Sequence, residues 1–262
     1  MNYALQARWV VPVDRPPIAG GIVSVADGRI VAVGENVSGR PPTDLGDVAL
    51  LPGFVNAHTH LEFSLLERPL GTPGMPIADW IAQVVSWRRG LQEELVVDPQ
   101  GLMGYRCRAV AAGLAESRAT GVAAVGEIAM PGCPLDAYSQ TAGIEVVALL
   151  ELLGLAEHRV QPLMELAAAH VARTSELPQM RPGLCPHATY TVHPQLLRET
   201  CALSRAQEIP VAIHVAESRQ ELELLESHSG PLVELLVKLN AWFPAALPRG
   251  MRPLDYLETL QN

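Results

Sequence analysis

Residues 51–64 read LPGFVNAHTHLEFS, and in this stretch one residue separates His58 from His60. The apolar residues before the pair and the turn signal Pro52–Gly53 predict a strand over residues 54–60. Residues two apart on a strand point to the same face, so the two imidazoles would lie side by side and could bind one metal ion. A bare H-x-H pair is more often two surface histidines, so the remaining sequence has to decide between these interpretations.

Two further motifs contain histidines at predicted strand ends. Residues 210–214 read PVAIH, which predicts a strand that ends in His214, and Glu217 follows three residues later. The string LCPHATYT at residues 184–191 predicts another strand end, at His187. Each of these histidines alone is typical of an ordinary strand end, whereas the three motifs together, in this order, indicate one site.

The pattern from residue 54 onward alternates between strand and helix. Strand patterns cover residues 54–60, 122–127, 144–151, 183–189 and 210–214. Helix patterns cover residues 77–92, 99–119, 157–175, 194–209, 219–226 and 230–240. Such alternation predicts parallel strands connected by helices. Functional side chains at the strand ends then indicate an α/β fold of the (β/α)8 TIM-type barrel class.

The predicted barrel is incomplete, because about five βα units are present where the fold needs eight. Residues 253–260 read as one more helix, after which the sequence stops. We therefore expect the chain to be the N-terminal portion of a longer protein or a truncated product.

A different pattern precedes the barrel. Apolar runs at residues 5–13 and 21–25, followed by the hairpin signal Asp27–Gly28, predict a small sheet of short strands. The expected domains are therefore residues 1–53, with these strands, and residues 54–262, with the barrel.

Composition narrows the class of protein. Of the 262 residues, 48% are hydrophobic and 18% charged, which is typical of a folded domain. The net charge of -9 and the lack of a basic cluster argue against a nucleic-acid partner, and no apolar run is long enough to span a membrane. Four scattered cysteines without a C-x-x-C pair suit reduced thiols. We expect a cytoplasmic protein whose partner is a small molecule, and a homodimer is compatible with the sequence.

The string PGFVNAHTH resembles the first barrel strand of the amidohydrolase superfamily, whose members usually read PG(F/L)-x-(N/D)-x-H-x-H. The later motifs resemble the mononuclear aminohydrolases of that superfamily, which include adenosine-type and cytosine deaminases and chlorohydrolases. The resemblance implies that His58, His60 and His214 bind one divalent metal and that His187 contacts the substrate base. It also implies that residues 1–53 form part of a β-sandwich.

The same resemblance implies the catalytic and cofactor roles. Glu217 would be the catalytic residue that relays protons. Binuclear members bridge two metals with a carboxylated lysine from the fourth strand, whereas the fourth strand here has His187, and the one lysine, Lys238, lies in a helix pattern. We therefore expect a single metal ion, and neutral imidazoles favour zinc or iron over magnesium or calcium.

Three further residues are candidates for substrate binding. Glu62 lies in the string HLEFS, which resembles aminodeoxyfutalosine deaminases of menaquinone biosynthesis and the related methylthioadenosine and S-adenosylhomocysteine deaminases. That resemblance implies hydrolytic deamination of an adenine-type nucleoside. Trp80 is expected near the mouth, but it lies seven residues from Trp87 and could instead pack on the barrel. Glu127 ends a strand, where it could bind ribose or face solvent.

Two alternatives stay open. The chain could belong to a chlorohydrolase or to a deaminase of another heterocycle, or it could be a non-catalytic barrel remnant. The second alternative arises because the family takes further ligands from a strand-six histidine and a strand-eight aspartate, and this sequence contains neither. His228 lies in a loop pattern and is interpreted as a solvated residue.

Overall fold

The computed structural model describes residues 2–95, 99–140 and 143–261. Contacts between Cα atoms divide the chain into two compact units, Met1–Phe54 and Val55–Asn262. The expected domains meet at nearly the same point in the chain. No helix within the described ranges is long and apolar enough to cross a membrane.

The first unit consists of short strands in two small sheets. One sheet has the strand order β5-β4-β1-β6 and the other β3-β2-β7. The strands are β1 Tyr3–Gln6, β2 Trp9–Val10, β3 Ile18–Ala19, β4 Ile22–Ala26, β5 Arg29–Val33, β6 Thr43–Asp44 and β7 Ala49–Leu50. The predicted turn between β4 and β5 has φ angles of 50° at Asp27 and 76° at Gly28, and a type I′ hairpin turn requires positive φ at both positions. Val10, Val23 and Val25 are buried in one core that contains residues of both sheets.

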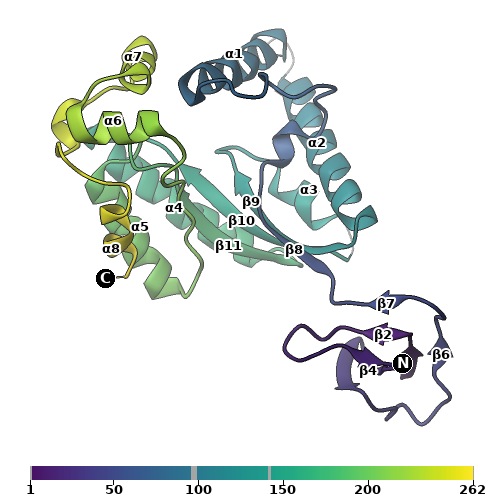
Figure 1. Cartoon of the computed structure of the whole chain (residues 1–262). Coiled ribbons are helices and arrows are strands. Elements are labelled where there is room, and N and C mark those ends of the chain that lie inside the picture. The colour runs from purple at the N-terminus through teal and green to yellow at the C-terminus, as the bar shows by residue number, and fades with distance from the viewer. Residues whose placement is uncertain (1, 96–98, 141–142, 262) are drawn as a thin grey trace. The chain divides into compact units, whose positions relative to one another are not determined.

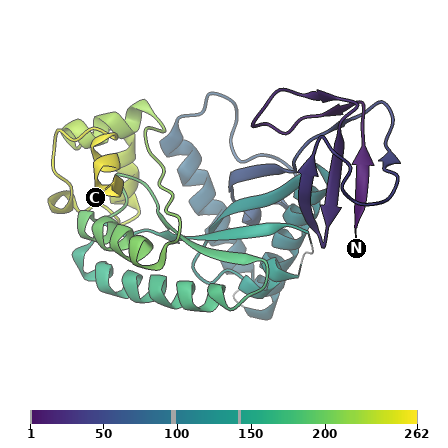
Figure 2. The ribbon, with the colours of Figure 1, turned by 90° about the horizontal axis from the view of Figure 1, so that it is seen from below.

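The second unit contains a sheet of parallel strands with helices around it, which confirms the predicted α/β class (Figure 1). Its strands are β8 Phe54–Thr59, β9 Val122–Ala129, β10 Glu145–Leu152 and β11 Met180–Pro186. They lie side by side in this order, as Figure 2 shows from a second direction. β10 pairs in parallel with both of its neighbours, for example Leu149 with Ile128 and Leu150 with Leu184.

The fifth predicted strand, residues 210–214, pairs with β11 less completely than its pattern suggests. It forms two isolated parallel bridges, Val211 with Leu184 and His214 with Ala188. The order of segments along the sheet still follows the order in the sequence. This segment therefore lies at the opposite edge of the sheet from β8.

A proline explains the interruption of this ladder. Pro186 is the last residue of β11 and has no N–H group, so it cannot donate to the neighbouring segment. The next amide, that of His187, donates to the carbonyl oxygen of Leu152 on β10, and the His187 carbonyl oxygen accepts from the His214 amide. β11 therefore ends at Pro186, short of the limit of the strand predicted over residues 183–189.

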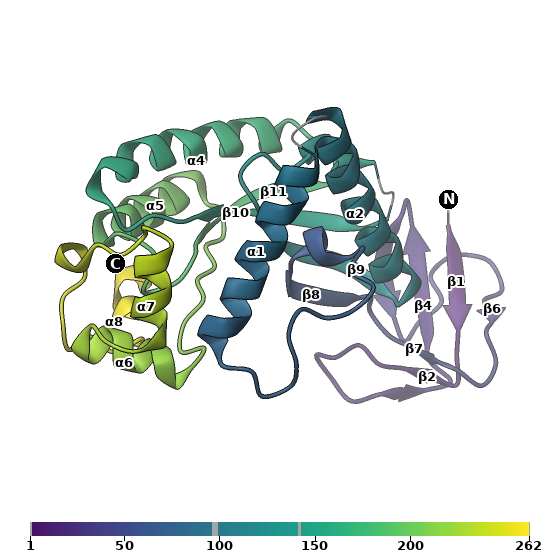
Figure 3. The ribbon, with the colours of Figure 1, turned by 90° about the horizontal axis from the view of Figure 1, so that it is seen from above.

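Helices connect the strands. They are α1 Ile77–Leu95, α2 Pro99–Ala119, α3 Leu135–Ser139, α4 Val160–Ser175, α5 Pro194–Gln207, α6 Arg219–Ser227, α7 Pro231–Lys238 and α8 Asp255–Gln261. α4 packs on β10 and β11, α5 on β11 and α2 on β9, while α1 contacts α7 (Figure 3). The short helix α3 has no counterpart in the sequence prediction, and the helix predicted over residues 157–175 begins with a 3-10 turn at Glu157–Arg159.

Local signals set the ends of α5. Pro194 occupies the first helical position, where the missing N–H costs nothing, and the His193 side chain accepts a hydrogen bond from the Gln195 amide. At the other end Glu208 adopts a left-handed conformation with φ of 53°, which ends the helix before Pro210.

A substitution at Gly126 in β9 tests whether β9 must approach β8 closely. A Cβ atom at this position would overlap the Ala57 carbonyl oxygen of β8, so Gly126→Ala should destabilise the protein by about 1–3 kcal/mol, the usual range for overpacking. Gly90 in α1 is the matched control, because a Cβ atom there would meet nothing within 4 Å. Gly90→Ala should be neutral or stabilising by up to about 1 kcal/mol, since alanine favours helix. Urea unfolding measures both, and equal stabilities would contradict this account of β9.

Candidate functional site

Three histidines converge from the two outer segments of the sheet. His58 lies on β8, His60 follows that strand, and His214 ends the segment beside β11. One ring nitrogen of each lies within 4.8 Å of the other two, and the Nε2 atoms of His58 and His60 are 3.3 Å apart. Two nitrogens bound to one tetrahedral zinc at about 2.0–2.1 Å are separated by roughly 3.3 Å. The structure thus brings together the three predicted metal ligands.

A hydrogen bond fixes the ring of His214. Its Nδ1 atom lies 2.8 Å from the carbonyl oxygen of His187. A carbonyl oxygen can only accept, so Nδ1 carries a proton, and in the neutral ring Nε2 has the lone pair. Metal-bound histidines usually have such a partner on the other ring nitrogen, which holds the ring in place. This arrangement of donors fits a zinc-type cation.

Burial and mutual repulsion favour the neutral form of two of these imidazoles, those of His58 and His60. Burial lowers the pKa of His58, and the neighbouring His214 lowers it further. Burial lowers the pKa of His60 to about 3, with smaller contributions from His58, His214 and Arg88. The Nδ1 atom of His60 is buried and has no hydrogen-bond partner among the described residues. A metal needs neutral imidazoles, so these shifts favour ligation at neutral pH.

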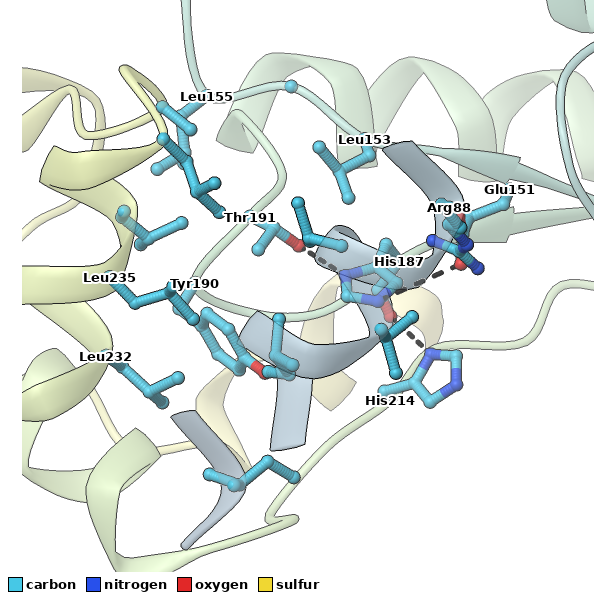
Figure 4. A pocket seen from close by; sticks show the side chains of 18 of the residues that line it. Arg88, Glu151, Leu153, Leu155, His187, Tyr190, Thr191, His214, Leu232 and Leu235 are labelled. Carbon is cyan, nitrogen blue, oxygen red and sulfur yellow. Dashed lines mark hydrogen bonds and ion pairs between the residues drawn. The ribbon is translucent and has the colours of Figure 1, made fainter. Parts of the chain in front are cut away.

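The three histidines line a cavity of about 820 Å³. The polar lining of this large cavity also includes His187, Glu151 and Glu217. Figure 4 shows His187 and His214 close together, with leucines farther along the wall. The apolar lining comes mainly from α1 and α7, with Ile77, Trp80, Ile81, Leu232, Leu235 and Leu236. A cavity of this size with few convergent polar groups is typical of a site for a small organic molecule.

Glu217 also lines this large cavity. The Tyr190 hydroxyl donates to its Oε2 atom over 3.3 Å. Burial raises the pKa of Glu217, while His214 and the hydrogen bond from Tyr190 act in the opposite direction. A carboxyl group whose pKa is raised toward neutrality can both accept and return a proton, which is what a proton relay needs.

His187 is held by its neighbours inside the large cavity. Its Nδ1 atom lies 2.7 Å from the Thr191 hydroxyl oxygen, and its Nε2 atom lies 3.8 Å from Oε1 of Glu151 (Figure 4). Burial lowers the pKa of His187 to about 3, with smaller contributions from neighbouring positive groups. His187 is therefore a neutral hydrogen-bonding group that faces the cavity.

Trp80 also lines the large cavity, from α1, and is 39% exposed. Trp87, seven residues later, lines a separate cavity and packs on Phe63, with 5.2 Å between the ring centroids. The two tryptophans therefore have different surroundings, and Trp80 is the one that could contact a substrate.

Glu62 lies outside the large cavity. It forms an ion pair with Arg88 of α1 and lines the smaller cavity, of about 50 Å³, together with Trp87. Arg88 lines both cavities. The structure thus presents the arginine to the large cavity, whereas the sequence prediction assigned substrate binding to the glutamate.

Glu127 also departs from its expected place. It is 2% exposed, and its carboxylate accepts hydrogen bonds from the Leu61 amide over 2.9 Å and from the Tyr138 hydroxyl over 3.0 Å. It lines the smaller cavity, not the large one. β9 continues to Ala129, so Glu127 does not end the strand as predicted. Its side chain faces neither ribose nor solvent but holds the segment that follows His60.

Sequence reasoning missed three residues of this region. Glu151, the last residue but one of β10, lines the large cavity, with its pKa raised by burial and lowered in part by Arg88. Tyr190 stands in the string around His187, but its contact with Glu217 depends on the tertiary fold. Glu221 could have been found from the spacing S-x-x-E at residues 218–221, which is a helix-capping signal.

Cys185 is a packing residue of the sheet. It is fully buried beside Ile128 and Leu149, and burial raises the pKa of its thiol. A thiol with a raised pKa holds little thiolate, so it is not an activated nucleophile.

Comparison with known proteins relates this geometry to one family. The sequence pattern of the Amidohydrolase family matches residues 49–233. A 5-methylthioadenosine/S-adenosylhomocysteine deaminase from Nitratidesulfovibrio vulgaris is 28% identical over 230 residues, which cover 83% of this chain and 49% of the relative. An aminodeoxyfutalosine deaminase from Deinococcus radiodurans is 27% identical over 258 residues, which cover 89% of this chain and 56% of the relative.

A solved structure agrees at the level of the fold. The crystal structure of Helicobacter pylori aminofutalosine deaminase is similar with a TM-score of 0.75 at 20% identity, over 99% of this chain and 60% of that one. The present chain thus spans about half the length of the curated relatives it matches.

Replacing a ligand should remove metal binding. Loss of a hydrogen-bond partner of a metal ligand usually weakens metal affinity by roughly 10- to 100-fold. We expect His58→Ala, His60→Ala and His214→Ala, which each remove a ligand itself, to weaken zinc affinity by more than this. His193→Asn is the control, because asparagine can also accept the helix-capping hydrogen bond that His193 makes. Equilibrium dialysis with zinc measures the four proteins, and unchanged affinity in His214→Ala would contradict a three-histidine site.

Glu127 should make stability depend on pH. Burial raises the pKa of Glu127 to about 8 in the folded protein, above its ordinary value of 4.5. Between these pH values the folded state keeps a proton that the unfolded chain releases, so the stability contributed by this group falls as pH rises. The free energy of unfolding of the unaltered protein minus that of Glu127→Gln should therefore fall by about 1 kcal/mol per pH unit in this window.

Urea unfolding at a series of pH values measures that difference. Glu226→Gln is the control, since Glu226 is exposed and its removal should leave the pH dependence unchanged. A difference for Glu127→Gln that does not vary with pH would mean that this buried carboxyl group stays ionised throughout.

Proposed function

Because this chain belongs to the amidohydrolase family, we propose that it forms part of a metal-dependent hydrolase that deaminates an adenine-type nucleoside. The observation that carries the proposal is the convergence of His58, His60 and His214 beside Glu217 in one large cavity. The names of the relatives support the same reaction, although the chain spans only about half of their length.

The three histidines would hold a single divalent cation. Three neutral imidazoles favour zinc among the common divalent metals. When bound, such a cation supplies a Lewis acid that brings the pKa of water toward neutrality. His214 is pre-oriented for this role by the hydrogen bond from its Nδ1 atom to the His187 carbonyl oxygen.

Glu217 would manage the protons of the reaction. Hydrolytic deamination forms a bond between water oxygen and the ring carbon, breaks the bond from that carbon to the amino group, and releases ammonia. Glu217 would take one proton from water and deliver it to a ring nitrogen. It would then pass the second proton of that water, from the hydroxyl group added to the ring carbon, to the leaving amino group. Its raised pKa suits both transfers, and the Tyr190 hydroxyl fixes the carboxylate while they occur.

The remaining lining would orient the nucleoside. His187, neutral and fixed by Thr191, can hydrogen-bond an edge of the base. The apolar residues of α1 and α7, with Trp80 among them, can cover a large 5′ substituent such as those of methylthioadenosine, S-adenosylhomocysteine or aminodeoxyfutalosine. A cavity of about 820 Å³ is wide enough for a substituted nucleoside.

Ammonia release tests the proposal directly. The complete gene product that contains this sequence and the 262-residue chain alone are loaded with zinc and offered the three nucleosides named above and adenosine. We expect the complete product to release ammonia, and Glu217→Gln to slow it by about 100- to 10,000-fold, the usual contribution of general acid–base catalysis. Chloride release from a chlorinated triazine, with no ammonia from any nucleoside, would favour a chlorohydrolase.

The isolated 262-residue chain should not deaminate and should aggregate. β8 lies at an edge of the sheet, with Val55 70% exposed, and open strand edges invite association. Light scattering and the ammonia assay measure these outcomes. Turnover by the isolated chain that His58→Ala abolishes would contradict the prediction.

A further inference from the structure

A fully buried acid lies next to the predicted proton relay. Glu221, in the first turn of α6, is 0% exposed. Its Oε1 atom accepts hydrogen bonds from the Thr189 hydroxyl over 2.7 Å and from the Ala216 amide over 3.2 Å. Its Oε2 atom accepts from the Glu217 amide over 2.7 Å. The carboxylate therefore binds three donors, two of which belong to the segment that leads from His214 to α6.

The start of α6 explains why the acid points this way. Ser218 is the N-cap, and its hydroxyl oxygen accepts from the Glu221 amide over 3.2 Å. In the usual capping box the acid at the third helical position accepts from the N-cap amide. Here the carboxylate reaches one and two residues farther back, to Glu217 and Ala216. The acid of the capping sequence thus holds the segment that precedes the helix.

The backbone between His214 and Ser218 needs such support. Ala216 has a φ of 59°, in the left-handed region that L-residues other than glycine, asparagine and aspartate rarely adopt. This turn directs two successive amides, of Ala216 and Glu217, toward the same carboxylate. Successive N–H groups in such a turn form a concave site for an anion, and the anion here is supplied by the chain itself.

The Glu221 carboxylate also holds the segment that carries Tyr190, the hydrogen-bond donor to the Glu217 side chain. Thr189, which donates to Glu221, directly precedes Tyr190, whose hydroxyl donates to Oε2 of Glu217 over 3.3 Å. Glu221 thus fixes the backbone of Glu217 directly and the position of its hydrogen-bond donor through the adjoining residue. Among the described residues that line the large cavity are Glu217 and Tyr190 but not Glu221.

We propose that Glu221 is a positioning residue that sets the carboxylate of Glu217 for proton transfer through its hydrogen bonds to Thr189, Ala216 and Glu217. The inference rests on the proposed function, because it assumes that Glu217 relays protons. Both carboxyl oxygens are used as acceptors, Oε1 by two donors and Oε2 by one. In a glutamine at this position, the amide group would meet either the Glu217 or the Ala216 amide donor to donor, so one backbone N–H would lose its partner.

The test is a double-mutant cycle in the zinc-loaded complete gene product, with ammonia release as the readout. Glu221→Gln should lower kcat by about 10- to 100-fold, as expected for a misplaced catalytic group, and should change KM by less than about threefold. In a protein that already carries Glu217→Gln, adding Glu221→Gln should lower kcat no further. Glu226→Gln, an exposed position on the same helix, is the matched control and should match the unaltered protein.

Other results of the cycle would overturn the inference. If the role of Glu221 is merely structural, the fold-losses in kcat caused by Glu221→Gln and Glu217→Gln should multiply in the double variant, or the zinc content should fall along with kcat. If Glu221→Gln does not fold, Thr189→Val replaces it, because that change removes one donor and leaves the two backbone donors in place. It should lower kcat by about 3- to 10-fold, and this loss should disappear in the Glu217→Gln protein. Unchanged kcat in Thr189→Val would then count against the inference.

A second readout separates this inference from the proposed function. If the unaltered protein deaminates none of the nucleosides, the proposed function fails, and amide hydrogen exchange decides about Glu221. The amides of Ala216 and Glu217 should exchange at least about tenfold faster in Glu221→Gln than in the Glu226→Gln control. Equal exchange rates in the two variants would show that Glu221 does not hold this segment.

Discussion

The site depends on the curvature of the parallel sheet. His58 and His60 belong to one outer segment and His214 to the other, with β9, β10 and β11 between them. In a flat sheet the outer segments would be about 19 Å apart, because neighbouring strands lie about 4.8 Å apart. Ligand nitrogens within 4.8 Å of one another therefore require the sheet to curl around them. Gly126 contributes to this geometry, since only a residue without a side chain allows β9 to approach the Ala57 carbonyl oxygen so closely.

Two buried carboxyl groups, those of Glu127 and Glu221, hold the turns that follow the outer segments of the sheet. Strands fix the direction of their last residues, but the functional side chains continue into turns that strand pairing does not control. Glu127 accepts from the amide of Leu61, directly after His60, and Glu221 accepts from the amides that follow His214. Each acid thus ties the turn after one of the two histidine-bearing outer segments to the body of the protein. The hydrogen bonds to backbone amides, together with those from Tyr138 and Thr189, offset the cost of burying the acids.

These acids also show why the sequence predicts the site only in part. The spacing of His58 and His60, and the position of His214 at the end of an apolar run, follow from strand periodicity and could be predicted together with the α/β class. Periodicity states which face a residue occupies, but not whether a long side chain reaches the cavity or turns to a nearby amide. Glu127 turns to an amide and Glu62 to Arg88, so the sequence could not place either one. Pro186 carried a readable signal, because a proline without an N–H had to interrupt the ladder to the next segment.

Chemistry and recognition are built on different parts of this fold. The groups that would bind the metal and move protons come from the strand ends and the turns behind them, which paired backbone and buried acids hold rigidly. The apolar lining comes mainly from α1 and α7, two helices that contact each other and lie at a distance in sequence. Side chains on these helices, such as Trp80 and Leu235, can therefore change with the substituent of the substrate while the reactive end stays the same. This separation gives a physical reason why proteins of one family can share metal ligands and yet act on different nucleosides.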